Sequence, residues 1–213
     1  MIKLVPGHER FRYPQQMDAM HRLRARVFAE RLAWSVKVEN GWEVDGFDKL
    51  DPLYLFSEDA DGRIRGTVRL LPTTGPNMLS DVFSELLPPN QSVRSPRIWE
   101  SSRFSVDHEA LAERSDKLIN RTTAELLCGM TEVGMRAGLD FIVSVVDVHM
   151  ERVLKRANCH CERLGEPKKI GKVTTIAGLW EIGDELLNNL RQASGIEGPV
   201  VVEEDLLKVD LAA

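Results

Sequence analysis

The residue types best suited to chemistry occur in segment 97–106, where Glu100 precedes Arg103 by three positions. Regular strand alternation would give this segment two faces, with Ile98, Glu100, Ser102 and Phe104 on one and Trp99, Ser101 and Arg103 on the other. A carboxylate beside large apolar residues is costly unless it is paired or used. The segment is therefore either an edge strand whose glutamate faces water or a reaction centre. A reaction centre requires an irregular strand that brings both charges to one side.

Four more charged residues lie close to apolar or aromatic ones: Arg24, Asp45, Asp48 and Arg69. Arg24 precedes Phe28 by four positions, so the two would lie on one face of a helix. With Glu100 and Arg103, these residues make three acids and three bases. One interpretation is a buried ion-pair network that fastens an irregular segment to a sheet, although such networks add little net stability over apolar packing. The other interpretation is a substrate site.

The elements that must position these residues alternate between helix and strand. Apolar residues at three- and four-residue spacing predict an amphipathic helix over 15–31. Residues 32–51 follow no regular period and contain two tryptophans, which is typical of a functional connection. A hairpin is predicted with strands 53–58 and 64–71, then a short helix over 79–87 and the strand 97–106.

The second half of the chain continues this alternation. Ser115 or Asp116 can cap a long helix that ends near Gly138. A buried strand is expected over 141–148, a helix over 150–157, a strand over 173–182 and a helix over 184–192. We expect one α/β domain over 1–213, with a mixed twisted sheet and helices on both faces. It comprises a helix and enclosing loop over 15–51, a sheet core over 53–192 and an unassigned tail over 195–213.

Composition excludes several classes of protein. The 213 residues carry a formal net charge of -5, which argues against a nucleic-acid partner. No apolar run approaches the roughly 20 residues of a membrane span, and the N-terminus lacks a secretory signal, so we expect a cytoplasmic protein with no membrane partner. Two of the three cysteines form Cys159-His160-Cys161 without a second pair of ligands. Buried or idle thiols are therefore expected, and no metal site.

Six motifs in order resemble those of the acyl-homoserine-lactone synthases, the autoinducer synthases of bacterial quorum sensing. They are Leu23-Arg24 with Phe28, Arg31-Leu32-Ala33-Trp34, Glu43-Val44-Asp45-Gly46-Phe47-Asp48, Thr67-Val68-Arg69-Leu70, Pro76-Asn77-Met78 and Glu100-Ser101-Ser102-Arg103-Phe104. The strand 142–148 extends the likeness, and the last forty residues add little. The resemblance implies a fold similar to that of the acetyl-coenzyme-A-dependent N-acetyltransferases (GNAT).

The resemblance also implies a reaction. The α-amine of S-adenosylmethionine attacks an acyl thioester, and the methionine carboxylate then displaces methylthioadenosine to close the lactone. Both molecules are co-substrates, and no tightly bound cofactor is implied. Glu100 is the expected base, with Arg103 as its catalytic partner. Apolar neighbours would raise the pKa of Glu100 and Arg103 would lower it, and the sequence leaves that balance open.

The resemblance assigns the remaining site residues in three groups. The residues expected around S-adenosylmethionine and the reacting acyl end are Arg24, Phe28, Trp34, Asp45, Asp48, Arg69, Ser102 and Phe104. The residues expected in the acyl pocket are Met78, Leu126, Ser144, Val146 and Met150, for each of which ordinary core packing is the alternative. The residues expected in a basic patch for an acidic acyl-carrier protein or for acyl-coenzyme A are Arg152, Lys155, Arg156, Lys168 and Lys169, with a solvated helix face as the alternative.

Two other functions remain open at this point. Segment 147–154 contains no glycine, unlike the pyrophosphate loop of an ordinary acetyltransferase, and this favours a donor carried by a protein. An N-acyltransferase that uses acyl-coenzyme A on another amine is nevertheless an alternative. A non-catalytic sensor or scaffold of the same fold is a second one.

Overall fold

The computed structural model describes residues 1–108, 110 and 116–208. Its main sheet has the strand order β1 (Ile2–Pro6), β4 (Leu53–Glu58), β5 (Ile64–Pro72), β6 (Ile98–Val106), β7 (Phe141–Asp147), β10 (Val173–Glu181) and β8 (Glu162–Arg163). The short strand β9 (Lys168–Ile170) also pairs with β10. Within it β6 and β7 run parallel, and the other strand pairs are antiparallel. A separate small hairpin joins β2 (Val38–Glu39) to β3 (Trp42–Glu43).

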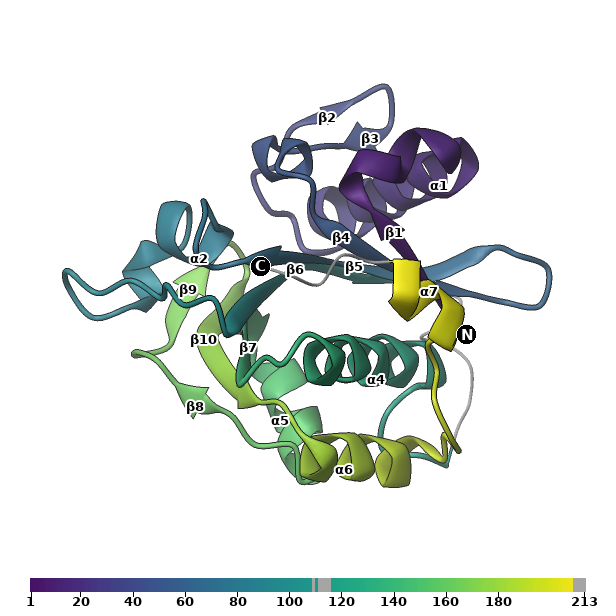
Figure 1. The fold of residues 1–213 in the computed structure, drawn as a ribbon. Coiled ribbons are helices and arrows are strands. Elements are labelled where there is room, and N and C mark those ends of the chain that lie inside the picture. Colours follow the sequence, from purple (N-terminus) through teal and green to yellow (C-terminus); the bar gives the residue numbers. More distant parts are fainter. Residues whose placement is uncertain (109, 111–115, 209–213) are drawn as a thin grey trace.

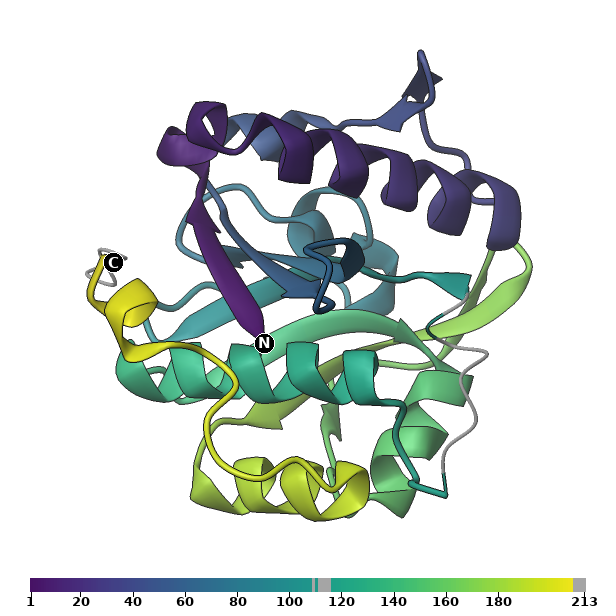
Figure 2. The ribbon, with the colours of Figure 1, turned by 90° about the vertical axis from the view of Figure 1, so that its right-hand side faces the viewer.

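Helices cover both faces of the main sheet, as the sequence predicted (Figures 1 and 2). One face, here called the α1 face, carries η1 (Gly7–Arg12), α1 (Pro14–Arg24), η2 (Ala25–Arg31) and η3 (Gly46–Lys49), with α2 (Met78–Asp81) and η4 (Ser84–Leu86) near its end. The other face, here called the α4 face, carries α4 (Arg121–Arg136), α5 (Val148–Arg156) and α6 (Asp184–Ser194). The short α7 (Glu203–Lys208) lies beside β1. None of the described helices is long and apolar enough to span a membrane.

The first long helix spans the predicted residues, but it is not α-helical throughout. The α-helical turns of α1 give way at Ala25 to the wider π-helical turns of η2. Such π segments are rare and occur frequently at functional sites. Here the widened turns bury Val27 and Phe28, whereas Arg31 stays exposed at the helix end.

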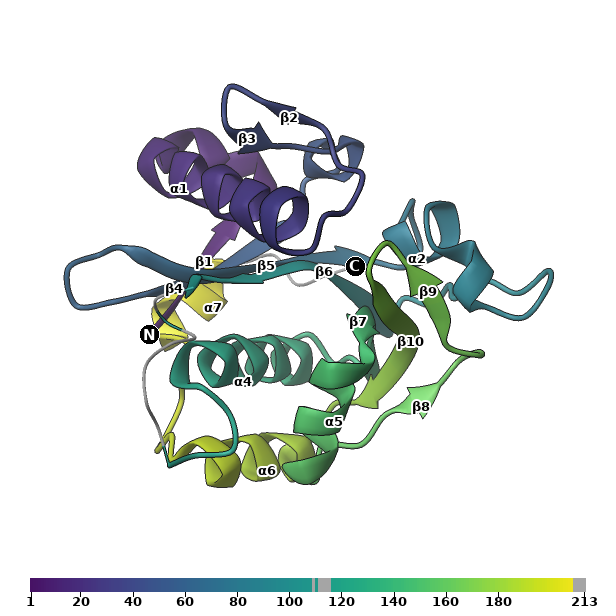
Figure 3. The same ribbon diagram turned by 180° about the vertical axis from the view of Figure 1, so that it is seen from behind.

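The parallel strands β6 and β7 separate part of the way along their length. Their pairing runs from Ile98–Phe141 to Ser101–Ser144 and then stops, although β6 continues to Val106 and β7 to Asp147. Figure 3 shows the two strands diverging. Strands that part in this way open a passage from one face of the sheet to the other.

A β-bulge in β6 confirms that this strand is irregular. Arg69 pairs with Ser102 but Thr67 pairs with Ser105, so two residues of β6, Arg103 and Phe104, lie opposite one residue of β5. Arg103 has a φ of 54°, in the left-handed region. The bulge brings Arg103 to the same side as Glu100. It also moves Phe104 to the α4 face, where it packs against the main core, so the expectation that Phe104 shares the face of Glu100 was wrong.

Some element boundaries differ from the prediction. The long helix α4 begins at Arg121, and the side chain of Asn120 caps it by accepting the N–H of Thr123 at 3.3 Å. Asp116 lies in a bend and is not the cap, while Ser115 lies outside the described residues. The strands β1, β8 and β9 were not predicted. Each is two to five residues long at the margin of the sheet, where too few residues alternate for a period to be recognised.

Candidate active site

A buried cluster of opposite charges joins α1, the segment after it and two strands of the sheet. Its bases are Arg24, Arg69 and Arg103, and its acids are Glu43, Asp45 and Asp48. With three charges of each sign, the cluster is formally neutral. The two interpretations of these residues are therefore combined in one structure, because the network fastens segment 43–48 to the sheet and one of its members reaches a cavity.

Arg24 lies at the centre of this network. Its Nε donates to Glu43 Oε2 at 2.6 Å, and its two Nη atoms donate to the Asp48 carboxylate at 2.8 and 3.0 Å. Burial opposes the charge of Arg24, but the Asp48, Glu43 and Asp45 carboxylates raise its pKa above the usual range. Burial alone would likewise raise the pKa of Asp48, yet the charges and hydrogen bonds of Arg24 and Arg69 lower it well below its ordinary value. The pair is ionised throughout the physiological range.

Asp45 and Asp48 also shape the chain that carries them. They form a capping box at η3, in which Asp45 Oδ1 accepts the Asp48 N–H at 3.3 Å and Asp48 Oδ2 accepts the Asp45 N–H at 2.9 Å. Arg69 donates to Asp45 Oδ1 at 2.6 Å and to Asp48 Oδ1 at 2.9 Å. Tyr54 adds a hydroxyl bond to Asp48 at 2.9 Å. Each carboxylate is thus fixed by several donors.

Arg103 is the member of the network that reaches the cavity. Its Nη2 lies 2.8 Å from Glu43 Oε1 and 3.0 Å from Asp45 Oδ2, and its guanidinium carbon lies 5.0 Å from the centre of the Phe28 ring. Burial lowers the pKa of Arg103, against the effect of Glu43 and Asp45. Its Nε is buried and has no hydrogen-bond partner among the described residues.

Glu43 is a site residue that the sequence prediction missed. Its side chain is 1% exposed and links Arg24 to Arg103 through its two carboxylate oxygens. The only signal was its place in the motif Glu43-Val44-Asp45-Gly46-Phe47-Asp48. Because β3 is two residues long, no strand pattern marked Glu43 as buried.

Glu100 stands apart from this network. It is 1% exposed, and its carboxylate accepts the backbone N–H groups of Met78 at 2.9 Å and Leu79 at 2.6 Å at the start of α2. Burial raises the pKa of Glu100, and the two backbone hydrogen bonds only partly oppose this effect. Among the described residues, no arginine or lysine forms an ion pair with it. The sequence left open whether burial or a neighbouring arginine would dominate the pKa of Glu100. In the structure burial dominates, so Glu100 is a carboxylate with increased proton affinity.

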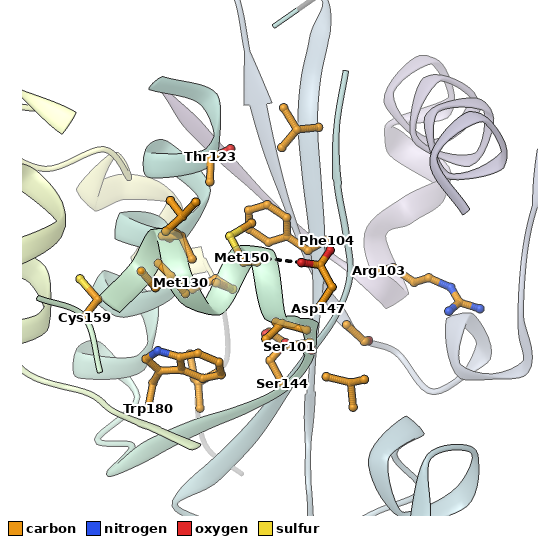
Figure 4. Close-up of a pocket in the computed structure, with 18 of the residues that line it drawn as sticks. Ser101, Arg103, Phe104, Thr123, Met130, Ser144, Asp147, Met150, Cys159 and Trp180 are labelled. Carbon is orange, nitrogen blue, oxygen red and sulfur yellow. Dashed lines mark hydrogen bonds between the residues drawn. The ribbon is translucent and has the colours of Figure 1, made fainter. Parts of the chain in front are cut away.

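A cavity of about 500 Å³ connects Glu100 and Arg103 to the interior of the protein. On the α1 face it is lined by Val27, Phe28, Leu32, Trp34, Met78 and Phe83. It passes Ser101 and Ser144, the last residue pair before β6 and β7 separate. On the α4 face it continues between α4, α5, α6 and β10, with Phe104, Met130, Met150, Cys159 and Trp180 in its wall (Figure 4). The cavity thus crosses the sheet, with a charged end and an apolar end.

A family model described as an autoinducer synthase matches residues 8–190. The chain belongs to the autoinducer synthase family. It is 42% identical over 167 residues to the acyl-homoserine-lactone synthase of Agrobacterium fabrum, which covers 78% of this chain and 79% of the relative. Its fold matches the crystal structure of the AHL synthase LasI with a TM-score of 0.79 and 31% identity over 93% and 98% of the two chains. It matches the CoA-dependent acyl-homoserine lactone synthase BjaI, solved with SAM and isopentyl-CoA, with a TM-score of 0.79 and 26% identity over 98% and 97%.

The family assignment confirms the resemblance seen in the motifs, and it makes the chain an acyltransferase enzyme. The residues of this synthase that were expected around the reacting groups fall into two sets. Phe28, Trp34, Ser102 and Phe104 line the cavity. Arg24, Asp45, Asp48 and Arg69 do not line it; they lie behind its wall, where they hold Arg103 and Ser102, whose Oγ accepts the Arg69 Nε–H at 3.1 Å.

Four of the five residues expected in the acyl pocket of the synthase line the cavity, namely Met78, Ser144, Val146 and Met150. Leu126 does not, and that expectation was wrong. It is fully buried in the core, and it approaches β5 so closely that a Cβ added to Gly66 would lie 2.9 Å from its Cδ1. Successive residues on a helix point in different directions, so the neighbouring Leu127 lines the cavity instead.

The basic residues expected to receive the acyl donor come from two elements. Arg152, Lys155 and Arg156 lie on α5, under the α4 face, whereas Lys168 and Lys169 lie on β9 at the margin of the sheet (Figures 1 and 3). Lys155 is also engaged by Glu151 at 3.0 Å. A role in donor binding therefore stays a prediction for each of the two groups separately.

Proposed function

We propose that the cavity is the site at which this synthase makes an N-acyl-homoserine lactone from S-adenosylmethionine and an acyl thioester, with Glu100 as the base. The observation that carries this proposal is the position of Glu100, a buried carboxylate of raised pKa that lines a cavity crossing the sheet. An ammonium cannot attack a thioester, so its proton must first be removed. A carboxylate whose ionised form is disfavoured by burial has the increased basicity that this step needs.

Charge balance supports a cationic substrate at the α1 end of the cavity. Because the three arginines of the network are matched by three carboxylates, an ionised Glu100 leaves one uncompensated negative charge. S-adenosylmethionine brings a sulfonium and an ammonium. The aromatic rings of Phe28, Trp34 and Phe83, which follow one another at centroid distances of 5.4 and 6.0 Å, provide faces that attract such cations.

Arg103 and the separated strands complete the proposed chemistry. The unpartnered Nε–H of Arg103 can donate to the substrate carboxylate, and so hold it for the second step, in which that carboxylate displaces methylthioadenosine. In the first step the thioester carbonyl becomes an oxyanion. Beyond Ser101 and Ser144, the backbone N–H groups on the sides of β6 and β7 that face each other have no partner strand in the described pairing, and they are candidates for stabilising it. The acyl chain would occupy the apolar end.

Asp147 supports a donor carried by a protein rather than by coenzyme A. A helix N-terminus is a common binding place for a pyrophosphate. At the start of α5 that place is taken, because the Asp147 carboxylate accepts the N–H groups of His149 and Met150, each at 2.8 Å. A second anion there would be repelled. A phosphopantetheine arm that extends from an acyl-carrier protein brings no pyrophosphate to this position.

The experiment supplies S-adenosylmethionine with matched acyl-carrier-protein and acyl-coenzyme-A donors and measures methylthioadenosine and lactone. The wild-type protein should form both products, with a higher kcat/KM for the carrier-protein donor, whereas Glu100→Gln should lose about 100-fold or more of the rate. Thiol release without methylthioadenosine would refute lactone synthesis, and the same assay with other amines would then test acylation of another amine. Equal or better use of acyl-coenzyme A would refute the donor assignment alone.

A further inference from the structure

The apolar end of the cavity, on the side away from the charged residues, is lined in part by buried side chains. Figure 4 shows Trp180 and Cys159 on the opposite side of the pocket from Arg103. The lining residues Ile142, Leu154, Cys159, Trp180 and Leu190 each expose 7% or less of their surface. Along α4, the lining extends from Thr123 to Thr131, a rise of eight residues or about 12 Å of helix at 1.5 Å per residue. A chain entering past Ser144 therefore reaches a wall within the core.

We propose that Trp180, whose indole forms part of this wall, limits the length of the acyl group that the synthase accepts. The inference rests on the proposed lactone synthesis and adds to it a residue that selects the donor. Trp180 is the largest side chain in the buried part of the wall. It lies on β10 opposite Ile142, and Gly178, two residues before it, lies opposite Ser144.

The position of the indole depends on Gly178. A Cβ added to Gly178 would lie 2.5 Å from Trp180 Cη2 and 2.6 Å from Cζ3, so only a glycine leaves room for the ring to lie over this strand. A Cβ at Gly178 would also lie 3.1 Å from the Sγ of Cys161, which limits movement on that side. The free space next to the ring is the cavity. A side chain at position 178 would therefore push the indole into the space of the acyl chain.

This geometry predicts opposite effects for two substitutions. Replacing the indole by a smaller side chain in Trp180→Phe or Trp180→Leu lengthens the cavity, whereas Gly178→Ala shortens it. Each methylene that gains or loses burial changes the relative kcat/KM of a donor by up to about fourfold. Two extra carbons thus correspond to a change of roughly tenfold or more in the preference between donors.

Trp99 provides a matched control. It is a buried tryptophan that pairs with Ile142 from the other side, on β6, and its indole nitrogen, like that of Trp180, has no hydrogen-bond partner among the described residues. It is not among the residues that line the cavity. Trp99→Phe therefore reproduces the loss of a buried indole from the sheet without lengthening the acyl site.

The experiment expresses each variant in a bacterial host that makes no lactone of its own and determines the lactones by mass spectrometry. Purified proteins are then compared with two donors that differ by two or four carbons, and their melting curves are recorded. Trp180→Phe and Trp180→Leu should shift the products to longer chains, Gly178→Ala to shorter ones, and Trp99→Phe should leave the distribution unchanged.

Two results would overturn the inference. One is a folded Trp180→Leu or Trp180→Phe protein with the wild-type distribution of chain lengths, and the other is the same shift in Trp99→Phe. Should Trp180→Leu fail to fold, Trp180→Phe and Gly178→Ala carry the test. A wild-type protein that makes no lactone would instead refute the proposed function, so the two failures are distinguishable.

Discussion

At the residue scale, the two charged groups of β6 are held by opposite means. Glu100 is buried against backbone donors and forms no ion pair within the described part of the chain, while Arg103 is surrounded by carboxylates and its Nε has no hydrogen-bond partner there. The first arrangement suits the proposed base, because burial disfavours the ionised form and raises the pKa of Glu100. The second keeps a cation charged within the protein. Their separate surroundings explain how two residues three positions apart can perform different tasks.

The raised pKa of Glu100 predicts the shape of the pH profile. Only the ionised carboxylate accepts a proton, so kcat/KM should fall as the pH decreases through a pKa above the ordinary value of 4.5. The Glu100→Gln protein should retain a low, residual activity without this acidic limb. Because burial favours the protonated form, ionisation of Glu100 also costs folding stability as the pH rises past its ordinary value. An identical acidic limb in both proteins would contradict the assignment of the base.

At the scale of elements, the bulge in β6 brings Glu100 and Arg103 together. It reverses the alternation of the strand after Ser102, and it does so with a non-glycine residue at a φ of 54°. Such a backbone conformation costs of order 1–3 kcal/mol and persists only where surrounding contacts enforce it. For Arg103, those contacts are Glu43, Asp45 and the ring of Phe28.

Two substitutions at Arg103 separate the backbone from the side chain. Arg103→Ala and Arg103→Gly both remove the guanidinium, leave Glu43 without one of its partners and should abolish most of the activity. Glycine adopts a positive φ at little cost, so Arg103→Gly should be more stable than Arg103→Ala by about 1 kcal/mol. Urea unfolding measures this difference. Equal stabilities would mean that the bulge relaxes once the arginine is removed.

At the scale of the whole molecule, the charge network joins the N-terminal part of the chain to the sheet. Segment 32–51 has little regular structure of its own, and its position is fixed by Asp45 and Asp48 on Arg24 and Arg69. The cavity needs both parts, because Phe28 and Trp34 lie in its wall on one side and the strands on the other. Loss of the network should therefore affect stability and activity together.

Asp48→Asn tests this connection. Removing one partner of a buried ion pair leaves the other uncompensated and costs about 3–5 kcal/mol. Because the pKa of Asp48 is lowered in the folded protein, its contribution is present above the ordinary aspartate pKa and is lost as the pH falls towards the folded value. Urea unfolding should show that Asp48→Asn has a much smaller free energy of unfolding than the wild type at neutral pH. At acidic pH the difference between the two proteins should be smaller. The control Asp51→Asn removes an exposed pair with Arg10 and should change stability by less than about 1 kcal/mol.

The sequence indicated the fold and most of the candidate site residues that line the cavity where a pattern was long or a motif dense. Periodicity predicted the helix 15–31, the hairpin before Pro72 and the strand that contains Glu100. Glu43 and the short strands β1, β8 and β9 could not be found in this way, since each lies in or forms a strand of two to five residues, too short for a period to be recognised. The same limit applies to Leu126, because periodicity identifies a buried helix face but not which of two adjacent residues meets a cavity.

The separation of β6 and β7 has a consequence for the sheet itself. Beyond Ser101 and Ser144, each strand presents an inner margin that the described pairing leaves without a neighbouring strand. Sheet margins usually lie at the outside of a protein, where they attract extended chains. Here two of them face each other inside one domain, like a sheet from which a strand has been withdrawn. An extended molecule lying between them would take the place of a strand. Binding at the site would then also supply the hydrogen-bond partners that the two margins lack.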